Sequence, residues 1–480
     1  MLGYILLGIA AALVILITVV VIRTLTFKVK PTEEKNYVTY GIDRDKAVSD
    51  LAEMIKCKTV SSVNKEEEDE AEFDKFKALL PRLFPNIHKY CTLENVGDRG
   101  LLYCLKGKSS DAPTVLMAHF DVVSVEEANW EKPPFDAVLE NGELWGRGTL
   151  DTKGTLNGAM QALEKLLSEG FVPENDLYLA FAGDEEVNGQ GAPMIVDLFE
   201  KRGITPGIVV DEGGAVVDKV FPGVSKPCAF IGIAEKGMLN LEFSYSGNGG
   251  HASSPKPHTP VGILSQACVK VEKKIFKHRI TKPAREMFNV VARHSSFFYR
   301  MIFANLWLFG GVLDLICKKS GGELNALMRT TCAFTQMEGS KGMNVIPPNA
   351  KMVANLRLLD GDTTDSAIEY ISKVIDNPRV KLRMINGMNP SRISRTDCEA
   401  WERVSNAVAG TWQDAIVSPY LMLACSDSRH WGRISDKVYR FSAMAMTKEE
   451  RGSIHGNNER ITVEAIEKTV EFYLRLISNS

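Results

Sequence analysis

The stretch TVLMAHFD, residues 114–121, decides the fold because an apolar run ends in an imidazole and a carboxylate. Two more apolar runs, Leu177–Gly183 and Ile208–Asp211, are also short and flanked by turn residues. Runs of this kind are typical of strands that are buried on both faces of a parallel sheet. An amphipathic helix begins at about Gly154, between the first two runs. We therefore predict an α/β architecture with a mostly parallel sheet.

Acidic and imidazole side chains stand at the ends of these predicted strands. Because the carboxyl ends of parallel strands meet at one edge of a sheet, we expect these side chains to converge there. Imidazole and carboxylate groups are ligands for divalent metals, and two neighbouring ions need a carboxylate between them. A glutamate beside activated water is a natural general base. The residues concerned are His119, Asp121, Asp151, Glu185, Glu186 and Asp211.

A second pattern begins near Lys236 and has the order β-α-β-β-α-β. This order predicts a ferredoxin-like α+β domain inserted within the first domain, with residues 276–325 as an extra loop or helical insert. The expected strands are Leu239–Tyr245, Cys332–Met337, Lys351–Leu358 and Val380–Ile385, and the expected helices are residues 259–273 and Thr364–Ile375. The predicted divisions are residues 1–30, 31–236, 237–387 and 388–480, and the last ends in a helix over Thr462–Ile477.

The amino-terminal segment Gly3–Ile22 has twenty residues without a charge. Twenty helical residues span about 30 Å, the thickness of the hydrocarbon core of a bilayer. No basic residue precedes the segment and no small-x-small site follows it, so we predict an uncleaved, single-pass transmembrane helix over a cleaved signal peptide. The positive-inside rule favours a folded part on the cytoplasmic side of the membrane. Because few charges follow the segment, the sequence does not fix the side of the membrane. The basic residues concerned are Arg23, Lys28, Lys30 and Lys35.

Composition excludes several classes of protein. The chain has 480 residues, of which 45% are hydrophobic, as is normal for a globular protein. Its 57 basic and 60 acidic residues give a formal charge of −3, so no nucleic-acid partner is expected. The nine cysteines form no CxxC pair and do not indicate a disulfide framework.

Five motifs indicate a family. MAHFDVV, GRGTLDTKG, GDEEVNGQGA, VVDEGG and SIHGNNE resemble, in order and spacing, the aminoacylase and glutamate-carboxypeptidase family of co-catalytic zinc peptidases. The similarity covers roughly residues 45–480 and looks closest to the branch of carboxypeptidase S and the N-fatty-acyl-amino-acid hydrolases. It implies a catalytic domain that binds two Zn²⁺, although Co²⁺ or Mn²⁺ would suit the same ligands. It also implies that the inserted domain is a lid that forms a homodimer.

The resemblance implies a role for each matching residue. His119 and Asp211 would bind one zinc, Glu186 and His455 the other, and Asp151 would bridge them. Glu185 matches the general base, and Asp121 would orient the imidazole of His119. Thr152 stands where the family often has an acidic residue or methionine.

Four further residues would bind the substrate or stabilise the transition state. His251, in GGHASSP, matches a lid histidine that resembles an oxyanion stabiliser and often reaches the neighbouring protomer's site; a turn histidine is the alternative. Asn344 and Arg357 match lid residues that hold substrate. Arg429 matches a position near the substrate carboxylate, which the planar guanidinium of arginine can bind through two hydrogen bonds.

We therefore expect a membrane-anchored, metal-dependent hydrolase that cleaves the amide next to a free carboxylate, in peptides or in N-acyl amino acids. An aminopeptidase or dipeptidase with the same metal core remains an alternative, as does an inactive membrane-anchored binding protein. The segment Ser295–Ile316 contains six aromatic residues. It would form lid core or a dimer contact, or else an acyl-chain groove or a membrane-dipping surface.

Overall fold

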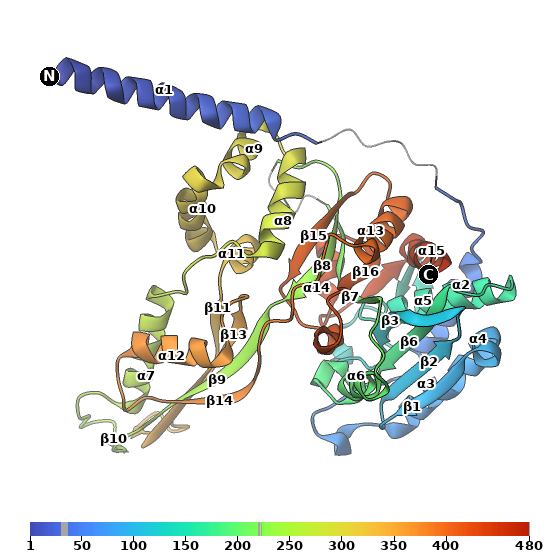
Figure 1. Cartoon of the computed structure of the whole chain (residues 1–480). Helices are drawn as coiled ribbons and strands as arrows, with labels where there is room; N and C mark the ends of the chain where they lie inside the picture. Colours follow the sequence, from blue (N-terminus) through green and yellow to red (C-terminus); the bar gives the residue numbers. More distant parts are fainter. Residues whose placement is uncertain (30–36, 219–220, 222, 480) are drawn as a thin grey trace.

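The stretch 114–121 lies at the centre of an eight-stranded sheet, in a computed structural model that describes residues 1–29, 37–218, 221 and 223–479. It begins within β3 (Ser109–His119), which pairs in parallel with β6 (Asn175–Ala182) and β7 (Ile208–Val217). Strand β7 pairs in parallel with β16 (Val438–Met446). The sheet order is β1-β2-β6-β3-β7-β16-β8-β15 (Figure 1). The outer strands are β1 (Thr92–Val96), β2 (Gly100–Leu105), β8 (Cys228–Glu235) and β15 (Ile416–Met422). The predicted α/β fold with a mostly parallel central sheet is confirmed.

Helices pack on both faces of this sheet. The amino-terminal α2 (Arg44–Ile55) and the final α15 (Val463–Ser478) both contact α5 (Lys153–Ser168) on one face. The predicted apolar stripe of α15, which includes Ile466 and Tyr473, is buried there. The other face packs against α6 (Gly191–Arg202). The remaining helices of this part are α3 (Glu70–Leu83), α4 (Pro85–Tyr90), α13 (Glu399–Thr411) and α14 (Lys448–Ser453), and a small sheet holds β4 (Val138–Glu140), β5 (Glu143–Trp145) and β17 (Arg460–Thr462).

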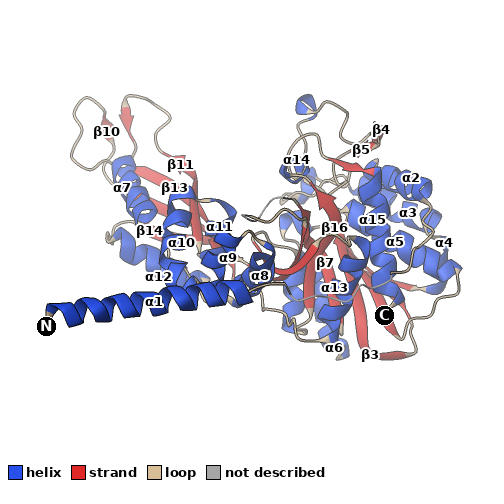
Figure 2. Cartoon of the chain, turned by 90° about the horizontal axis from the view of Figure 1, so that it is seen from above, coloured by secondary structure: helices blue, strands red, loops and turns tan. Residues whose placement is uncertain are grey.

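A second, antiparallel sheet lies beside the first part, as Figure 2 shows from above. Its order is β11-β13-β9-β14, and α7 (Pro260–Lys273) and α12 (Thr364–Ile375) share its apolar core. This is the predicted β-α-β-β-α-β order. Its strands are β9 (Gly237–Ser246), β11 (Thr331–Glu338), β13 (Asn349–Leu358) and β14 (Lys381–Met388). A separate two-stranded sheet pairs β10 (Gly250–His251) with β12 (Val345–Ile346). We refer to this part as the lid.

The segment predicted as a loop or helical insert is helical and packs away from the lid sheet. Its helix α8 (Lys282–Val291) contacts β15 of the large sheet. The helices α9 (Phe297–Ala304), α10 (Leu306–Ser320) and α11 (Gly322–Met328) follow. The long amino-terminal helix α1 (Leu2–Thr26) contacts α9. Helix α1 is apolar and long enough to cross a membrane, a property that it shares with signal sequences.

The contact between α5 and α15 gives a test of this packing. A Cβ atom added at Gly158 would lie 2.4 Å from Cγ2 of Thr469, so one helix must shift. We expect Gly158→Ala to lower the free energy of unfolding by about 1–3 kcal/mol, despite the better helix propensity of alanine. Urea unfolding measures the change. Gly452→Ala, whose Cβ would meet nothing within 4 Å, is the control and should leave stability unchanged or slightly raised. Equal stability of the two variants would contradict the packing.

Candidate metal centre

Six side chains meet at the carboxyl end of the central strands. The carboxylate of Asp151 lies between two imidazoles, with Oδ1 3.0 Å from Nε2 of His119 and Oδ2 3.0 Å from Nε2 of His455. Nε2 of His455 is also 3.0 Å from Oε2 of Glu186. Potential ligand atoms of His119, Glu185 and Glu212 lie within 4.8 Å of one another, as do those of His119, Asp151 and Glu186. Asp151 is thus placed to contribute one oxygen to each of two neighbouring ions.

The donor set fits divalent metal ions. All four carboxylates belong to residues that are buried or half-buried, and only two imidazoles are available to balance them. Oε1 of Glu186 is buried and has no hydrogen-bond partner in the part of the chain that the structure describes. Buried carboxylates without partners are costly unless a cation compensates them. Nitrogen and oxygen ligands of these types suit zinc, cobalt or manganese.

Glu212, and not Asp211, lies beside the imidazole of His119 in the structure. Neighbouring side chains of a strand point to opposite sides, so Asp211 and Glu212 cannot both face the centre. Oε2 of Glu212 lies 3.6 Å from Nε2 of His119. Oδ2 of Asp211 instead accepts a hydrogen bond from the backbone N–H of Ser428 at 2.9 Å. Asp211 therefore contacts the short helix Asp427–Arg433, whereas Glu212 is the member of this pair that lies beside His119.

Asp121 connects three of the converging groups. Nδ1 of His119 lies 2.9 Å from the backbone carbonyl oxygen of Asp121, its hydrogen-bond partner, and 3.3 Å from Oδ1 of Asp121. The same Oδ1 accepts a hydrogen bond from the backbone N–H of Glu185 at 3.2 Å. Its Oδ2 accepts from the N–H of Glu186 at 3.1 Å and from the hydroxyl of Ser61 at 2.7 Å. These bonds orient the imidazole and the turn after β6 together, which agrees with the orienting role expected for Asp121.

Two further residues position the loop that carries Asp151. The hydroxyl of Thr152 donates to the backbone carbonyl of His119 and accepts from its N–H, both at 3.0 Å. Thr152, which departs from the family pattern, therefore links the loop of Asp151 to β3. The buried carboxylate of Glu459 accepts from the N–H of Leu150 at 2.8 Å and lies 2.6 Å from Nη1 of Arg147. Glu459 lies in the motif that carries His455, so it joins the two loops.

The carboxylates of the cluster differ in the direction of their pKa shifts. Burial opposes ionisation of Asp151, but hydrogen bonds with His119 and His455 outweigh it and lower the pKa of Asp151. Burial raises the pKa of Glu185 well above its usual value; His119 opposes this rise, and Glu212 adds to it. Burial and the negative charge of Asp151 likewise raise the pKa of Glu212. Glu185 has a raised pKa and no ion pair with an imidazole among the described residues, whereas Glu212 pairs with His119 and Glu186 pairs with His455.

The four predicted substrate or oxyanion residues lie in different places. His251 and Asn344 are both exposed at the two-stranded sheet of the lid, where the N–H of Ala252 donates to the carbonyl of Asn344 at 2.9 Å. Both views place β10 far from β3 and β7 (Figures 1 and 2). The structure thus brings neither His251 nor Asn344 to the metal centre of the same chain. Arg357 lies on β13 with Nη1 3.3 Å from Sγ of Cys425.

Arg429 is buried close to the centre and has free donors. It belongs to the helix that Asp211 contacts, and its Nη2 lies 3.9 Å from Oε2 of Glu235. Neither Nη1 nor Nη2 has a hydrogen-bond partner among the described residues. Glu235 is already paired with Arg440, whose Nε lies 2.6 Å from Oε1. Arg429 can therefore offer its guanidinium to another carboxylate.

Sequence reasoning missed Glu212 and Asp427. Burial raises the pKa of Asp427 well above its usual value, and Asp211 and Asp184 add to that rise. Its Oδ2 has no hydrogen-bond partner within the described ranges. The adjacent acids in VVDEGG signalled a ligand, but the choice between them depends on strand orientation. No sequence signal separated Asp427 from an ordinary loop acid.

An α/β sheet with this buried cluster of acids and imidazoles defines a metal-dependent hydrolase. Residues 115–479 match Peptidase family M20/M25/M40, and the chain belongs to this family. The predicted family is thus confirmed, as are the enzyme class and the similarity to the stated branch. Enzymes of the family depend on a dinuclear metal centre.

Similar proteins agree with this assignment. The chain is 34% identical to "Probable carboxypeptidase S-like 2" of Dictyostelium discoideum, over 97% of this chain and 92% of that protein. It is 33% identical to the "N-fatty-acyl-amino acid synthase/hydrolase PM20D1" of Xenopus tropicalis, over 98% and 93%. The fold resembles the M20 family metallo-carboxypeptidase Sso-CP2 of Sulfolobus solfataricus, with a TM-score of 0.66 and 16% identity over 90% and 98% of the two chains.

Measurements of metal content can test whether Glu212 or Asp211 is a metal ligand. We expect Glu212→Ala to lose roughly half of the bound divalent metal, because one of two ions loses a carboxylate ligand. Asp211→Asn, which keeps an oxygen for the Ser428 N–H, should retain the wild-type content. Elemental analysis after dialysis against metal-free buffer measures both variants. Normal metal content in Glu212→Ala together with loss in Asp211→Asn would return the ligand role to Asp211.

Proposed function

We propose that the chain is a membrane-anchored amidohydrolase that cleaves the amide bond next to a free carboxylate with the help of two zinc ions. The observation that carries this proposal is the carboxylate of Asp151 between His119 and His455. His119 and Glu212 would hold one ion and Glu186 and His455 the other, with Asp151 shared. The ions would polarise the substrate carbonyl and acidify a water molecule.

Glu185 is the proposed general base and acid. Its backbone N–H donates to Asp121, and burial raises its pKa, so this carboxylate binds a proton more readily than an exposed one. It would take the proton of the attacking water and return it to the nitrogen of the leaving amine. Glu186, the next residue, contacts His455 and is therefore assigned to the metal instead.

Arg429 is the proposed partner of the substrate carboxylate. Its buried and unpartnered terminal nitrogens support this role, because a planar guanidinium binds a carboxylate through two parallel hydrogen bonds. Arg357 and Asn344 would hold the substrate from the lid. His251 would stabilise the oxyanion, and its place at the tip of the lid favours a contribution from a partner subunit in a homodimer.

An apolar cavity favours N-acyl amino acids among the possible substrates. The cavity has a volume of about 280 Å³. Its lining includes Gly213 and Ile454, the sequence neighbours of the proposed metal ligands Glu212 and His455. It also includes Glu323 and Arg451, which pair with each other at 3.4 Å. The rest of the lining includes Phe230, Met287, Leu324, Leu327 and Tyr420. A hydrocarbon chain would be stabilised there, whereas the backbone of a peptide would leave polar groups without partners.

Helix α1 is the proposed membrane anchor. Its apolar side chains are mostly exposed, as expected for a helix whose surroundings are lipid. Its last turns are bonded to the folded part: both Nε and Nη2 of Arg23 donate to the carbonyl of Ala304, at 3.3 and 3.1 Å. These bonds support a helix that is retained, since a cleaved signal sequence would leave the Ala304 carbonyl without them.

The role of Glu185 predicts a specific defect. We expect Glu185→Gln to lower kcat by about 10²–10⁴-fold, because the amide cannot accept the proton of the attacking water. Its metal content should stay normal, since the proposed ligands are unchanged. Steady-state kinetics and elemental analysis of the same sample give both values. Glu169→Gln, at an exposed carboxylate after α5, is the control. Wild-type turnover in Glu185→Gln would exclude this mechanism.

The apolar cavity predicts a change in chain-length preference. We expect Leu324→Trp to lower kcat/KM for long-chain N-acyl amino acids by about tenfold or more and to leave N-acetyl amino acids nearly unaffected. Amidation of the substrate carboxyl should abolish cleavage of both. The control is Val172→Trp, at an exposed position remote from the cavity lining. An equal effect on short and long chains would exclude the cavity as the acyl site, and preference for dipeptides with a free amine would favour the aminopeptidase or dipeptidase alternative.

A further inference from the structure

The helices α9 and α10 present large apolar side chains to the outside of the molecule. Leu315 is 68% exposed, although side chains of its type are usually buried. We call the following set the α9–α10 face, and every member is more than half exposed: Phe297, Phe298, Trp307, Val312, Leu315 and Ile316. A contiguous set of this size marks an interaction surface.

The α9–α10 face is joined to the carboxyl end of α1. The side-chain amide of Asn305, between the two helices, donates to Oγ1 of Thr24 and to the carbonyl of Val20, both at 3.3 Å. Arg293, just before α9, donates to the carbonyl of Lys28 at 3.0 Å and stacks over the ring of Phe27. The end of α1 and the junction of α9 with α10 therefore lie side by side, and Figure 1 shows α9 directly below the end of α1.

The two helices are too short and too bent to cross a bilayer by themselves. They meet at an angle of 108°. Helix α10 has 15 residues, which span about 22 Å, less than the hydrocarbon thickness of about 30 Å. Apolar helices of this kind that also carry aromatic and basic side chains lie in the plane of the membrane interface.

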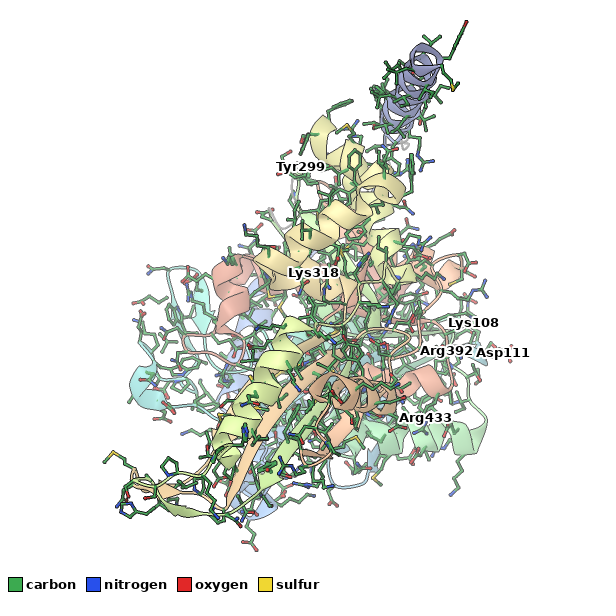
Figure 3. All side chains as sticks on the ribbon, turned by 90° about the vertical axis from the view of Figure 1, so that its left-hand side faces the viewer. Lys108, Asp111, Tyr299, Lys318, Arg392 and Arg433 are labelled. Carbon is green, nitrogen blue, oxygen red and sulfur yellow. The ribbon has the colours of Figure 1, made fainter. Side chains whose placement is uncertain are left out.

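The charged residues of α9 and α10 are compatible with a position in the membrane interface, where an unpaired acid would be unfavourable. Asp314, the one acid of α10, is buried and pairs with Arg329, so no negative charge lies on the α9–α10 face. Arg300 lies within α9, and Lys318 and Lys319 follow Ile316 at the end of α10. Lys318 also pairs with Asp314 at 3.0 Å. Figure 3 shows Tyr299 and Lys318 at opposite ends of this segment, below α1.

We propose that the α9–α10 face lies in the interface of the lipid bilayer, in the leaflet where α1 leaves it. This inference rests on the anchoring role proposed for α1. Because α1 runs obliquely from the body, contact requires α1 to cross at a tilt, as membrane-spanning helices commonly do. The neighbouring helices α8 and α11 contribute Met287, Leu324 and Leu327 to the apolar cavity. The contact therefore brings the cavity close to the lipid in which long-chain N-acyl substrates dissolve.

Tryptophan fluorescence of the full chain tests this position. Of the six tryptophans, Trp307 is the one within α9 and α10, and α1 contains none. The full chain is reconstituted into phosphatidylcholine nanodiscs with or without brominated acyl chains, which quench nearby indoles. We expect brominated lipid to remove a fraction of the emission in the wild type. Trp307→Phe should abolish that loss, and Trp401→Phe, at a half-buried ring beside Tyr439, should preserve it.

The outcomes separate this inference from the anchor itself. Flotation of the chain with the lipid reports insertion of α1. Flotation without quenching, or equal quenching in wild type and Trp307→Phe, would overturn the membrane contact while leaving the anchor intact. Dissociation of a dimer by Leu315→Glu without any quenching would overturn it in favour of a second copy of this chain. Failure of the chain to float would overturn both the anchor and the contact, whatever the enzyme's activity.

Discussion

The concentration of negative charge at one edge of the large sheet is the constraint on which the rest of the site depends. Four carboxylates from buried or half-buried residues converge on two imidazoles, of which His119 is buried and His455 is exposed. In such surroundings uncompensated charges are costly, so the arrangement is stable only with cations between them or with carboxyl groups that hold protons. The surrounding hydrogen bonds hold the side chains in place despite their repulsion. Asp121 fixes the turn after β6, and Glu459 joins the loops of Asp151 and His455.

The helical insert relates the reaction site to the membrane. It begins within the lid sequence, but α8 packs on the large sheet, so the insert lies between the two parts. Its inner residues Met287 and Leu324 line the cavity beside the proposed metal ligands, and its outer residues form the α9–α10 face. One segment can thus present an apolar lining to the acyl chain of a substrate and an apolar surface to the lipid.

Much of the site was predictable from sequence because its residues follow apolar runs directly. His119 ends β3, and Glu185 and Glu186 follow β6, so the strand pattern alone brought them to one edge. The sequence could not predict which of Asp211 and Glu212 faces His119, because both lie in β7 and their side chains point to opposite faces of the sheet. Asp427 and the free donors of Arg429 were also inaccessible, because burial and missing partners arise from contacts between distant segments.

The sequence by itself determined the types of ligand, their order along the chain, the α/β class and the apolar amino-terminal helix. These features depend on local composition and periodicity, which the chain carries without reference to its fold. Only the tertiary structure decided that Glu212 faces His119, that His251 lies at the tip of the lid, and that the aromatic segment contacts the last turns of α1. Each of these outcomes depends on which surfaces pack together, and packing is a property of residues that are far apart in the sequence.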